Sequence, residues 1–170
     1  PDVLMMYLLL DDDLVAGSLD AALDHYLPRT AHGSSLSPAV CASLLARAGR
    51  IEEALRWFRW AARLDLDDLE GTTAGGLHLA TIGGVWQAMT SGFLGVREHQ
   101  GGLLIDPRVP PSWGRVEHRF SFRGTQVRIE VDGDVARVDC SHEIVVGAVD
   151  RARRRRRHVF CRTPEGWTRR

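Results

Sequence analysis

The chain of 170 residues contains no lysine, so all 22 of its basic residues are arginine. It has only three cysteines, Cys41, Cys140 and Cys161, which lie far apart and form no CxxC pair. Their odd number and wide spacing argue against a zinc site and against a disulfide framework. We therefore expect no bound metal and a reducing, cytoplasmic location.

Long hydrophobic runs are also missing. The most apolar segment, VLMMYLLL at residues 3–10, is much shorter than the roughly 20 residues that span a bilayer, and three aspartates follow it. No basic segment precedes this run, which argues against a signal peptide. The sequence therefore predicts no membrane partner, and its length suits one large domain or two small ones.

The charges balance to zero but are unevenly distributed. Segment 1–28 carries six aspartates and no arginine, whereas RARRRRR occupies positions 151–157. A block of like charges without apolar periodicity is usually disordered or solvated, so we predict a disordered tail over residues 150–170. Such a block attracts polyanions at low salt. It lacks interleaved aromatic residues for base stacking, so no specific nucleic-acid partner is expected.

Hydrophobic residues at helical spacing predict five helices in the first part of the chain. They cover about residues 2–10, 19–27, 38–48, 51–62 and 77–94. Ser18 and Ser37 are natural N-caps, and Gly49 suits the left-handed position that ends the third helix. The very short connection to the fourth helix predicts an antiparallel helical hairpin.

The first and last helices carry further expectations. Residues 2–10 are apolar nearly all round, which predicts a buried helix. Gly83 and Gly84 interrupt the last helix, where each glycine costs up to about 1 kcal/mol. We expect a close contact with a neighbouring helix to offset this cost. The apolar face of the last helix is predicted to comprise Ile82, Val85, Trp86, Met89 and Phe93.

The periodicity changes after Gly101. Apolar residues predict strands at residues 103–105, 116–122 and 125–131, and residues 143–149 are a weaker candidate. Arg123–Gly124 and Asp132–Gly133 predict hairpin turns. Helices followed by an antiparallel β unit indicate an α+β fold with two layers or two domains.

The segment TAHGSSLSPAV at residues 30–40 is a candidate anion site. A glycine-containing turn before a helix presents backbone N–H groups, and the helix dipole adds partial positive charge there. Ser34 and Ser35 add hydroxyl donors, and His32 and Arg29 can add charge. Spacing alone also fits an ordinary turn that leads into a capped helix, and it favours this simpler interpretation.

Other polar and aromatic groups carry weaker signals. His78 follows the glycine-containing segment GTTAGG, which is not GxGxxG after a strand, so a dinucleotide-binding fold is not indicated. The acidic residues of segment 65–70 are interpreted as a solvated loop, since spacing alone cannot establish a glycosidase pair of carboxylates. Trp57 and Trp60 are interpreted as packing residues.

A helical interaction module is the alternative of another class. AGRIEEALRWFRWAARLDLDD resembles a tetratricopeptide helix, and the earlier segment AGSLDAALDHY echoes part of it. Pro28 cuts the echo short and no third copy is present, whereas solenoids need about three repeats. This alternative therefore has little support in the sequence.

Four segments occur together and in a specific order: VLMMYLLL, YLPRTAHGSSLSPAV, AARLDLDDLEGTTAGGLHLATIGGVWQAMTSGFLGV and LLIDPRVPPSWGRVEHRFSFRG. Together they resemble the C-terminal part of glycoside hydrolase family 65, the maltose, trehalose and kojibiose phosphorylases. The resemblance covers about residues 2–131. It implies that residues 1–97 are the last helices of an (α/α)6-barrel catalytic domain and that residues 98–149 form a C-terminal β-sandwich unit.

The resemblance also implies a reaction, in which phosphate cleaves an α-glucosyl disaccharide with inversion to give β-glucose 1-phosphate and glucose. The implied phosphate ligands are His32, Gly33, Ser34, Ser35 and His78. Inorganic phosphate is then a co-substrate and no cofactor is needed. The implied partners are the disaccharide, phosphate and a second subunit in a homodimeric parent protein. An acid-trehalase-like hydrolase of the same family is the alternative.

The sequence departs from the family pattern in three respects. The later motif commonly reads Glu-Gly-Ile-His, whereas this chain has GGLH with Gly75 at the acidic position. The general-acid glutamate lies upstream, so this chain holds no catalytic residue. The arginine-rich end does not resemble the family β-sandwich, and a shifted reading frame is one hypothesis for it. Because the chain opens on Pro1, we interpret it as part of a longer protein or a truncated copy of one.

Overall fold

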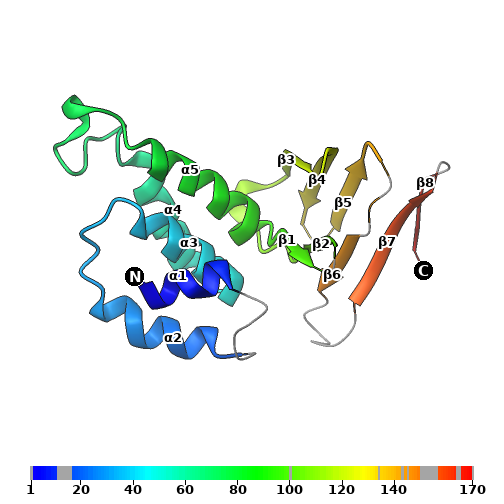
Figure 1. The fold of residues 1–170 in the computed structure, drawn as a ribbon, viewed down its shortest axis with the longest axis horizontal. Helices are drawn as coiled ribbons and strands as arrows, with labels where there is room; N and C mark the ends of the chain where they lie inside the picture. Colours follow the sequence, from blue (N-terminus) through cyan, green and yellow to red (C-terminus); the bar gives the residue numbers. More distant parts are fainter. Residues whose placement is uncertain are drawn as a thin grey trace. The chain divides into compact units, whose positions relative to one another are not determined.

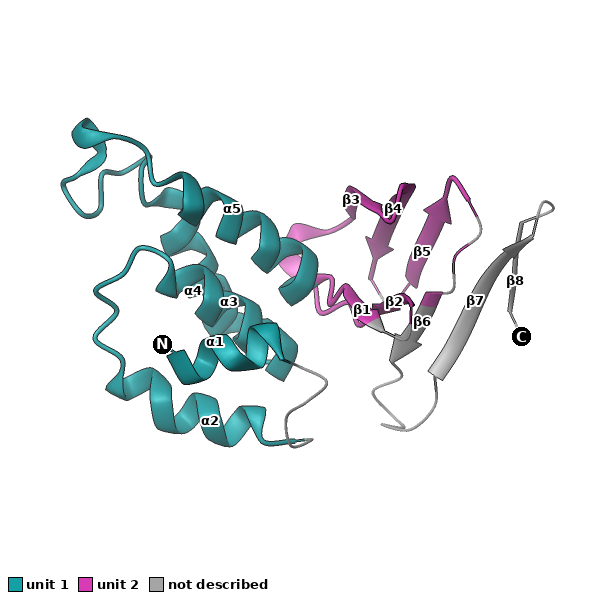
Figure 2. Cartoon of the chain, viewed as in Figure 1, with its two compact units in different colours: residues 1–93 teal, residues 94–170 magenta. Residues whose placement is uncertain are grey.

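The computed structural model describes residues 2–10, 17–99, 101–133, 135–142, 144, 146–149, 157–163 and 166–169 (Figure 1). The chain divides into two compact units, residues 1–93 and residues 94–170 (Figure 2). Unit 1 is helical and unit 2 is built from strands, which confirms the predicted α+β class. Among the described residues, no helix has both the length and the apolar character needed to cross a membrane.

Unit 1 contains all five predicted helices. They are α1 (Asp2–Leu9), α2 (Leu19–Tyr26), α3 (Ser37–Ala48), α4 (Ile51–Arg63) and α5 (Leu79–Gln87). Two short 3₁₀ turns, η2 (Leu27–Arg29) and η3 (Thr73–Gly75), lie in the connections, and a π-helical segment, η4 (Ala88–Phe93), continues α5.

Helix α3 is the centre of unit 1. Its residues from Ser37 to Ala46 are all buried, and it packs against α1, α2, α4, α5 and η4. Gly49 ends it with a φ of 84°, which confirms the predicted left-handed position. The chain then turns directly into α4. The predicted antiparallel hairpin is thereby formed, and it buries Leu44, Leu45 and Leu55.

Glycines allow the α5–η4 rod to lie very close to α3. A Cβ added at Gly84 would be 2.8 Å from Cβ of Ala39, and one added at Gly92 would be 2.8 Å from Cα of Ser43. The predicted close contact is therefore present at Gly84. No described atom lies within 4 Å of a Cβ placed at Gly83, so that glycine makes no such contact.

The predicted apolar face of α5 is partly wrong. Phe93 is fully buried, but Ile82 and Trp86 are each 51% exposed. The side of the helix that faces α3 holds small residues, Thr81, Gly84 and Ala88, because only these fit at so short a distance. The larger side chains therefore point away from α3.

Two further predictions about the helices are corrected. Helix α1 is not buried all round: Leu4 is buried, whereas Leu9 is 71% exposed. Ser18 occupies the predicted N-cap position of α2, but its hydroxyl bonds to the Tyr7 hydroxyl at 2.9 Å and makes no capping hydrogen bond. Ser37 was wrongly predicted as an N-cap, since it is the first residue of α3.

Unit 2 contains two sheets. One has the order β1 (Arg97–His99), β2 (Gly102–Ile105), β6 (Val146–Val149), β7 (Arg157–Thr163) and β8 (Gly166–Arg169). The other has the order β3 (Val116–Phe122), β4 (Thr125–Asp132) and β5 (Val135–Cys140). All predicted strands are present, and β1, β5, β7 and β8 are additional. Strands β2 and β6 pair in parallel, and the segment that contains β3, β4 and β5 provides the long connection that a parallel pair needs.

The three-stranded sheet shows a clear alternation. Val127, Ile129 and Val131 of β4 are buried on one face, while Arg128 and Glu130 lie on the other with cross-strand ionic partners. At the predicted turn between β3 and β4, Arg123 has a φ of 47° and Gly124 one of 79°, values typical of a tight hairpin turn.

The arginine-rich tail was predicted to be disordered. Its described segments, Arg157–Thr163 and Gly166–Arg169, are strands, which their β-branched and aromatic residues favour. The rest of the arginine run, residues 151–156, lies outside the described residues, and there the expectation of disorder stays a prediction.

Candidate functional site

The loop between η2 and α3 holds His32 in a specific position. Its backbone φ of 51° is left-handed, a conformation that few residues other than glycine adopt. Its Nε2 lies 3.3 Å from the Leu27 carbonyl oxygen, and its ring centroid lies 4.5 Å from that of Trp57 on α4. Trp57 in turn stacks on Trp60, with centroids 5.2 Å apart. The predicted packing role of Trp57 therefore includes support of the His32 ring.

The two serines of the loop have different partners. The Ser34 hydroxyl oxygen accepts the N–H of Leu36 at 3.3 Å and keeps its own hydrogen available for donation. The Ser35 carbonyl oxygen accepts the hydroxyl of Thr81 on α5 at 3.0 Å. Gly33 is exposed, and a Cβ placed there would meet no described atom within 4 Å. The loop is thus tied to α5 while its tip stays open.

Two buried polar atoms of this loop have no hydrogen-bond partner among the described residues. They are Nδ1 of His32 and Oγ of Ser37 at the start of α3. An unpaired buried polar atom costs about 1–3 kcal/mol, and most such atoms in native proteins are paired. Ser37 is the first residue of α3, where the helix dipole favours an anion, and His32 belongs to the loop that precedes this helix.

His78 immediately precedes α5 and is held by an acidic loop. Its backbone N–H donates to Oδ2 of Asp65 at 2.8 Å, and its Nδ1 lies 2.6 Å from Oδ1 of the same carboxylate. The hydrogen bond to Asp65, and to a smaller extent the nearby charges of Glu70 and Asp68, raise the pKa of His78 above its ordinary value. The hydrogen bond to Asp65 therefore favours the protonated form of the His78 ring.

The structure joins the two predicted motifs through α5. His78 precedes the first residue of this helix, and Thr81, in its first turn, holds the Ser35 carbonyl. The helix thus carries His78 at its start and anchors the serine loop one turn later. The roles of Asp65, Thr81 and the Ser37 hydroxyl were not predicted from the sequence. A carboxylate beside the end of α4 was visible in the sequence, but only the fold brings it to His78 across the intervening loop.

The prediction that the acidic segment 65–70 is a solvated loop is only partly correct. Asp65 is only 12% exposed at its side chain because it is bound to His78, and Asp68 accepts the backbone N–H of Thr73 at 2.9 Å. Asp67 fits the prediction better, since its carboxylate binds Arg63 of α4 at the surface. The segment therefore orders the loop that positions His78.

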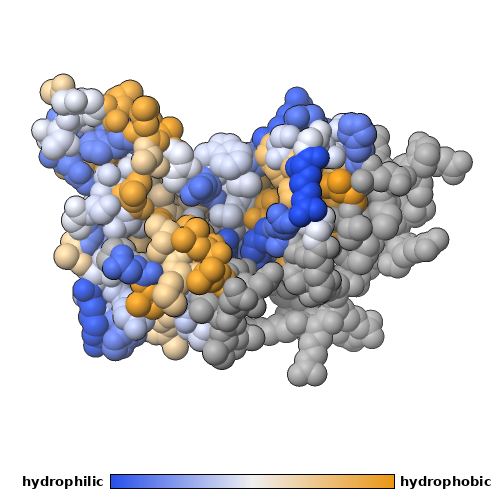
Figure 3. Space-filling model, viewed as in Figure 1, coloured by the Kyte–Doolittle hydropathy of each residue, from blue (hydrophilic) through white to orange (hydrophobic). Residues whose placement is uncertain are grey.

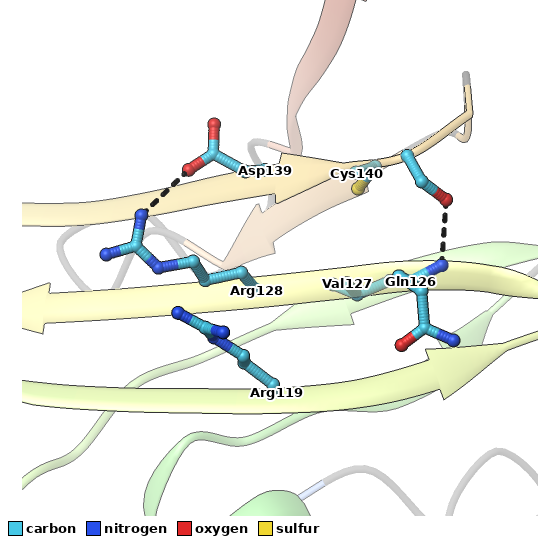
Figure 4. A pocket seen from close by; sticks show the side chains of 7 residues that line it. Arg119, Gln126, Val127, Arg128, Asp139 and Cys140 are labelled. Carbon is cyan, nitrogen blue, oxygen red and sulfur yellow. Dashed lines mark hydrogen bonds and ion pairs between the residues drawn. The ribbon is translucent and has the colours of Figure 1, made fainter.

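A separate pocket of about 390 Å³ lies on the three-stranded sheet of unit 2 (Figure 4). Its lining includes Arg119 and Arg128, but both arginines already bind Glu117, and Arg128 also faces Asp139 at 3.6 Å. The charges of this pocket are therefore compensated internally, and it does not offer the same anion chemistry as the loop of unit 1.

Other chemistries find little support in the described part of the chain. It contains no group of three or more histidine, cysteine or acidic side chains placed to hold a metal ion. Burial raises the pKa of the Cys41 thiol to about 11, which makes it a poor nucleophile.

Comparison with known proteins gives the family. Residues 1–87 match the model of the glycosyl hydrolase family 65 central catalytic domain, and residues 96–144 match that of the glycosyl hydrolase family 65 C-terminal domain. The chain belongs to glycosyl hydrolase family 65. The helical hairpin of α3 and α4 is thus part of a catalytic domain, which replaces the interpretation as a tetratricopeptide module.

Its relatives include phosphorylases. The chain is 33% identical over 131 residues to an alpha,alpha-trehalose phosphorylase of Thermoanaerobacter brockii and 35% identical over 133 residues to a kojibiose phosphorylase of Halothermothrix orenii. These matches cover 77% and 78% of this chain but 17% of each relative. A solved structure named "Putative kojibiose phosphorylase from human microbiome" matches with a TM-score of 0.80 and 29% identity, covering 87% of this chain and 20% of that one.

Proposed function

We propose that this chain is the C-terminal part of an inverting glycoside phosphorylase and supplies its phosphate site. The proposed ligands are His32, Gly33, Ser34, Ser35 and His78. The observation that carries the proposal is the junction at α5, where the Thr81–Ser35 hydrogen bond links the serine loop to the helix that starts beside His78. Hydroxyl donors, two helix N-termini and a histidine of raised pKa together suit a phosphate ion.

The chemistry follows from what this site offers. Phosphate held here replaces the water molecule that a hydrolase activates, so the phosphate oxygen attacks the anomeric carbon from the face opposite the leaving group. The positive charges and hydroxyl donors hold and orient the phosphate dianion against the repulsion of nearby carboxylates. A glutamate outside this chain protonates the leaving sugar oxygen, and the product is β-glucose 1-phosphate.

An exposed apolar surface supports a larger parent protein. Leu79, Ile82 and Trp86 lie at successive turns of α5 and are 71%, 51% and 51% exposed, and hydrophobic surface gathers at the N-terminal end of this helix (Figure 3). Exposed patches of this kind usually mark a surface covered by other protein. Since the chain spans 17% of the length of the curated relatives described above, we propose that upstream barrel helices cover this face.

An acid-trehalase-like hydrolase is the second candidate, because the two matching family models are named for glycosyl hydrolases. The two candidates differ in their use of phosphate. The test is to incubate the longer protein that contains this segment with trehalose, kojibiose and maltose, with and without inorganic phosphate. Phosphate-dependent release of β-glucose 1-phosphate supports the phosphorylase. Equal release of free glucose in both conditions would overturn the proposal.

A further inference from the structure

Asp65 makes an unusual pair of bonds to a single residue. It follows the buried Leu64 at the end of α4, and this anchor fixes the start of the loop that leads to α5. One carboxylate oxygen of Asp65 accepts the backbone N–H of His78 at 2.8 Å, and the other lies 2.6 Å from Nδ1 of its ring. Backbone and ring of His78 are therefore fixed by the same side chain.

The chemistry of this pair determines where the protons are. An ionised carboxylate can only accept hydrogen bonds, so Nδ1 of His78 carries a proton. In the neutral ring Nε2 would then be an acceptor, which repels an anion. In the imidazolium form Nε2 also bears a proton and can donate to an anion. A donor at Nε2 therefore requires that the ring stay charged.

Nε2 of His78 has only long contacts, which it can exchange for contacts with an anion. Its neighbours are the Thr72 hydroxyl at 3.4 Å and a Glu70 carboxylate oxygen at 3.9 Å. Both distances are long compared with the 2.6 Å contact at Nδ1. The ring is thus held firmly on its Asp65 side and weakly on the other side.

We propose that Asp65 is a positioning residue of the phosphate site, which fixes the orientation of His78 and keeps Nε2 in the proton-bearing form that donates to phosphate. This inference rests on the proposed function, because the anion it serves is the proposed phosphate. Within the described structure the charged groups that face His78 are Asp65, Asp68 and Glu70, and of these Asp65 alone makes a short contact with the ring.

A substitution can separate charge from shape. Asp65→Asn removes the negative charge and keeps one oxygen that can accept from Nδ1, but it loses the acceptor for the backbone N–H of His78. Asp65→Ala removes the charge and both acceptors. The matched control is Asp67→Asn in the same loop, because the Asp67 carboxylate binds Arg63. The Asp67→Asn variant therefore measures the effect of losing a negative charge from the loop while the contacts of His78 stay intact.

The experiment is a pH titration of the histidine rings of the chain by NMR, from about pH 5 to about pH 9, with His78→Gln used to assign the signal. Asp65→Asn is expected to lower the pKa of His78, whereas Asp67→Asn leaves it unchanged. Isothermal titration with inorganic phosphate at neutral pH is expected to show at least about tenfold weaker binding in Asp65→Asn. Binding recovers at acidic pH in Asp65→Asn but not in Asp65→Ala.

An unchanged pKa of His78 in Asp65→Asn would overturn the inference. Should this variant fail to fold, the pH profile of the phosphate KM in the longer protein gives the second readout. A shift of this profile towards acid in Asp65→Asn supports the positioning role, and an identical profile contradicts it. A lowered pKa in Asp65→Asn, combined with no phosphate binding by the unsubstituted protein, would instead contradict the proposed function and leave the Asp65–His78 pairing intact.

Discussion

His32 and His78 enter the candidate site from loops of different construction. His32 is supported by the ring of Trp57 and a backbone carbonyl, in a left-handed backbone conformation, with one ring nitrogen unpaired among the described residues. His78 has a negative φ of −79° and lies beside the carboxylates of Asp65 and Glu70. The comparison shows that two histidines of one proposed site can depend on different forces, one on shape and packing and the other on charge.

The largest effect we expect is the absence of catalysis in this chain on its own, although it contains the loops of both His32 and His78. Residues 1–170 alone should release no glucose 1-phosphate, because the proposed general acid lies outside them. They should also unfold at a lower temperature than the longer protein. Each large apolar side chain left uncovered, such as Ile82 or Trp86, forfeits about 1.5–3 kcal/mol against a total of about 5–15 kcal/mol.

Thermal unfolding and a phosphorolysis assay of the chain and of the longer protein check this expectation. Glucose 1-phosphate formation by the chain alone would contradict it.

Replacing the charge-dependent histidine should have the next largest effect. His78→Gln removes a charge-assisted donor, so phosphate affinity should fall by about tenfold to a hundredfold. The matched control is His25→Gln, at an exposed position of α2. The phosphate KM of the longer protein measures the effect, and an unchanged value in His78→Gln would remove His78 from the site.

His32→Ala tests the contribution of packing to the site, whereas His78→Gln tests the contribution of charge. The variant loses the contact with Trp57 and the unpaired Nδ1, so we expect weaker phosphate binding without the change in pH dependence expected for Asp65→Asn. Phosphate titrations at several pH values check this. A pH profile displaced as in Asp65→Asn would show that the two histidines do not depend on different forces.

Both the stability and the phosphate affinity of the protein should depend moderately on pH. The pKa of folded His78 is raised, so its ionic contribution to stability is complete below the unfolded value of about 6.5 and is lost as pH rises through the raised pKa. Phosphate affinity should weaken over the same window above about pH 6.5, because Nε2 loses its proton. Unfolding curves and phosphate titrations across this range measure both, and stability that rises through the window would have the wrong sign.

The smallest expected effect concerns the buried hydroxyl of Ser37. Ser37→Ala removes an unpaired polar atom, so without phosphate its stability should be unchanged or slightly higher, within about 1 kcal/mol. The additional stability conferred by phosphate should decrease if this hydroxyl contributes to the site. Melting temperatures with and without phosphate test this, and a variant clearly destabilised without phosphate would show that Ser37 has a structural partner instead.

Periodicity was sufficient to predict the helices and four of the eight strands, because elements such as α3, α4 and β4 follow simple apolar patterns. Periodicity gave the wrong inner face for α5, because it predicted that the large apolar residues of this helix face the core. Close helix packing reversed that choice at Gly84 and Ala88, and such packing depends on the neighbour and not on the helix sequence. The histidines and serines of the site were found from local motifs and family resemblance. Asp65 and Thr81 were missed because their roles arise only when α4, α5 and the serine loop meet.

The most direct test of the account is a titration of the chain with inorganic phosphate at low temperature, followed by the NMR signals of His32, Ser34, Ser35 and His78. We expect these signals to shift together along one binding curve, while those of His25 in α2 and of Arg119 and Arg128 in the three-stranded sheet stay unchanged. Shifts confined to the arginines, or no saturable change at either histidine, would contradict a phosphate site at the junction of the serine loop and α5.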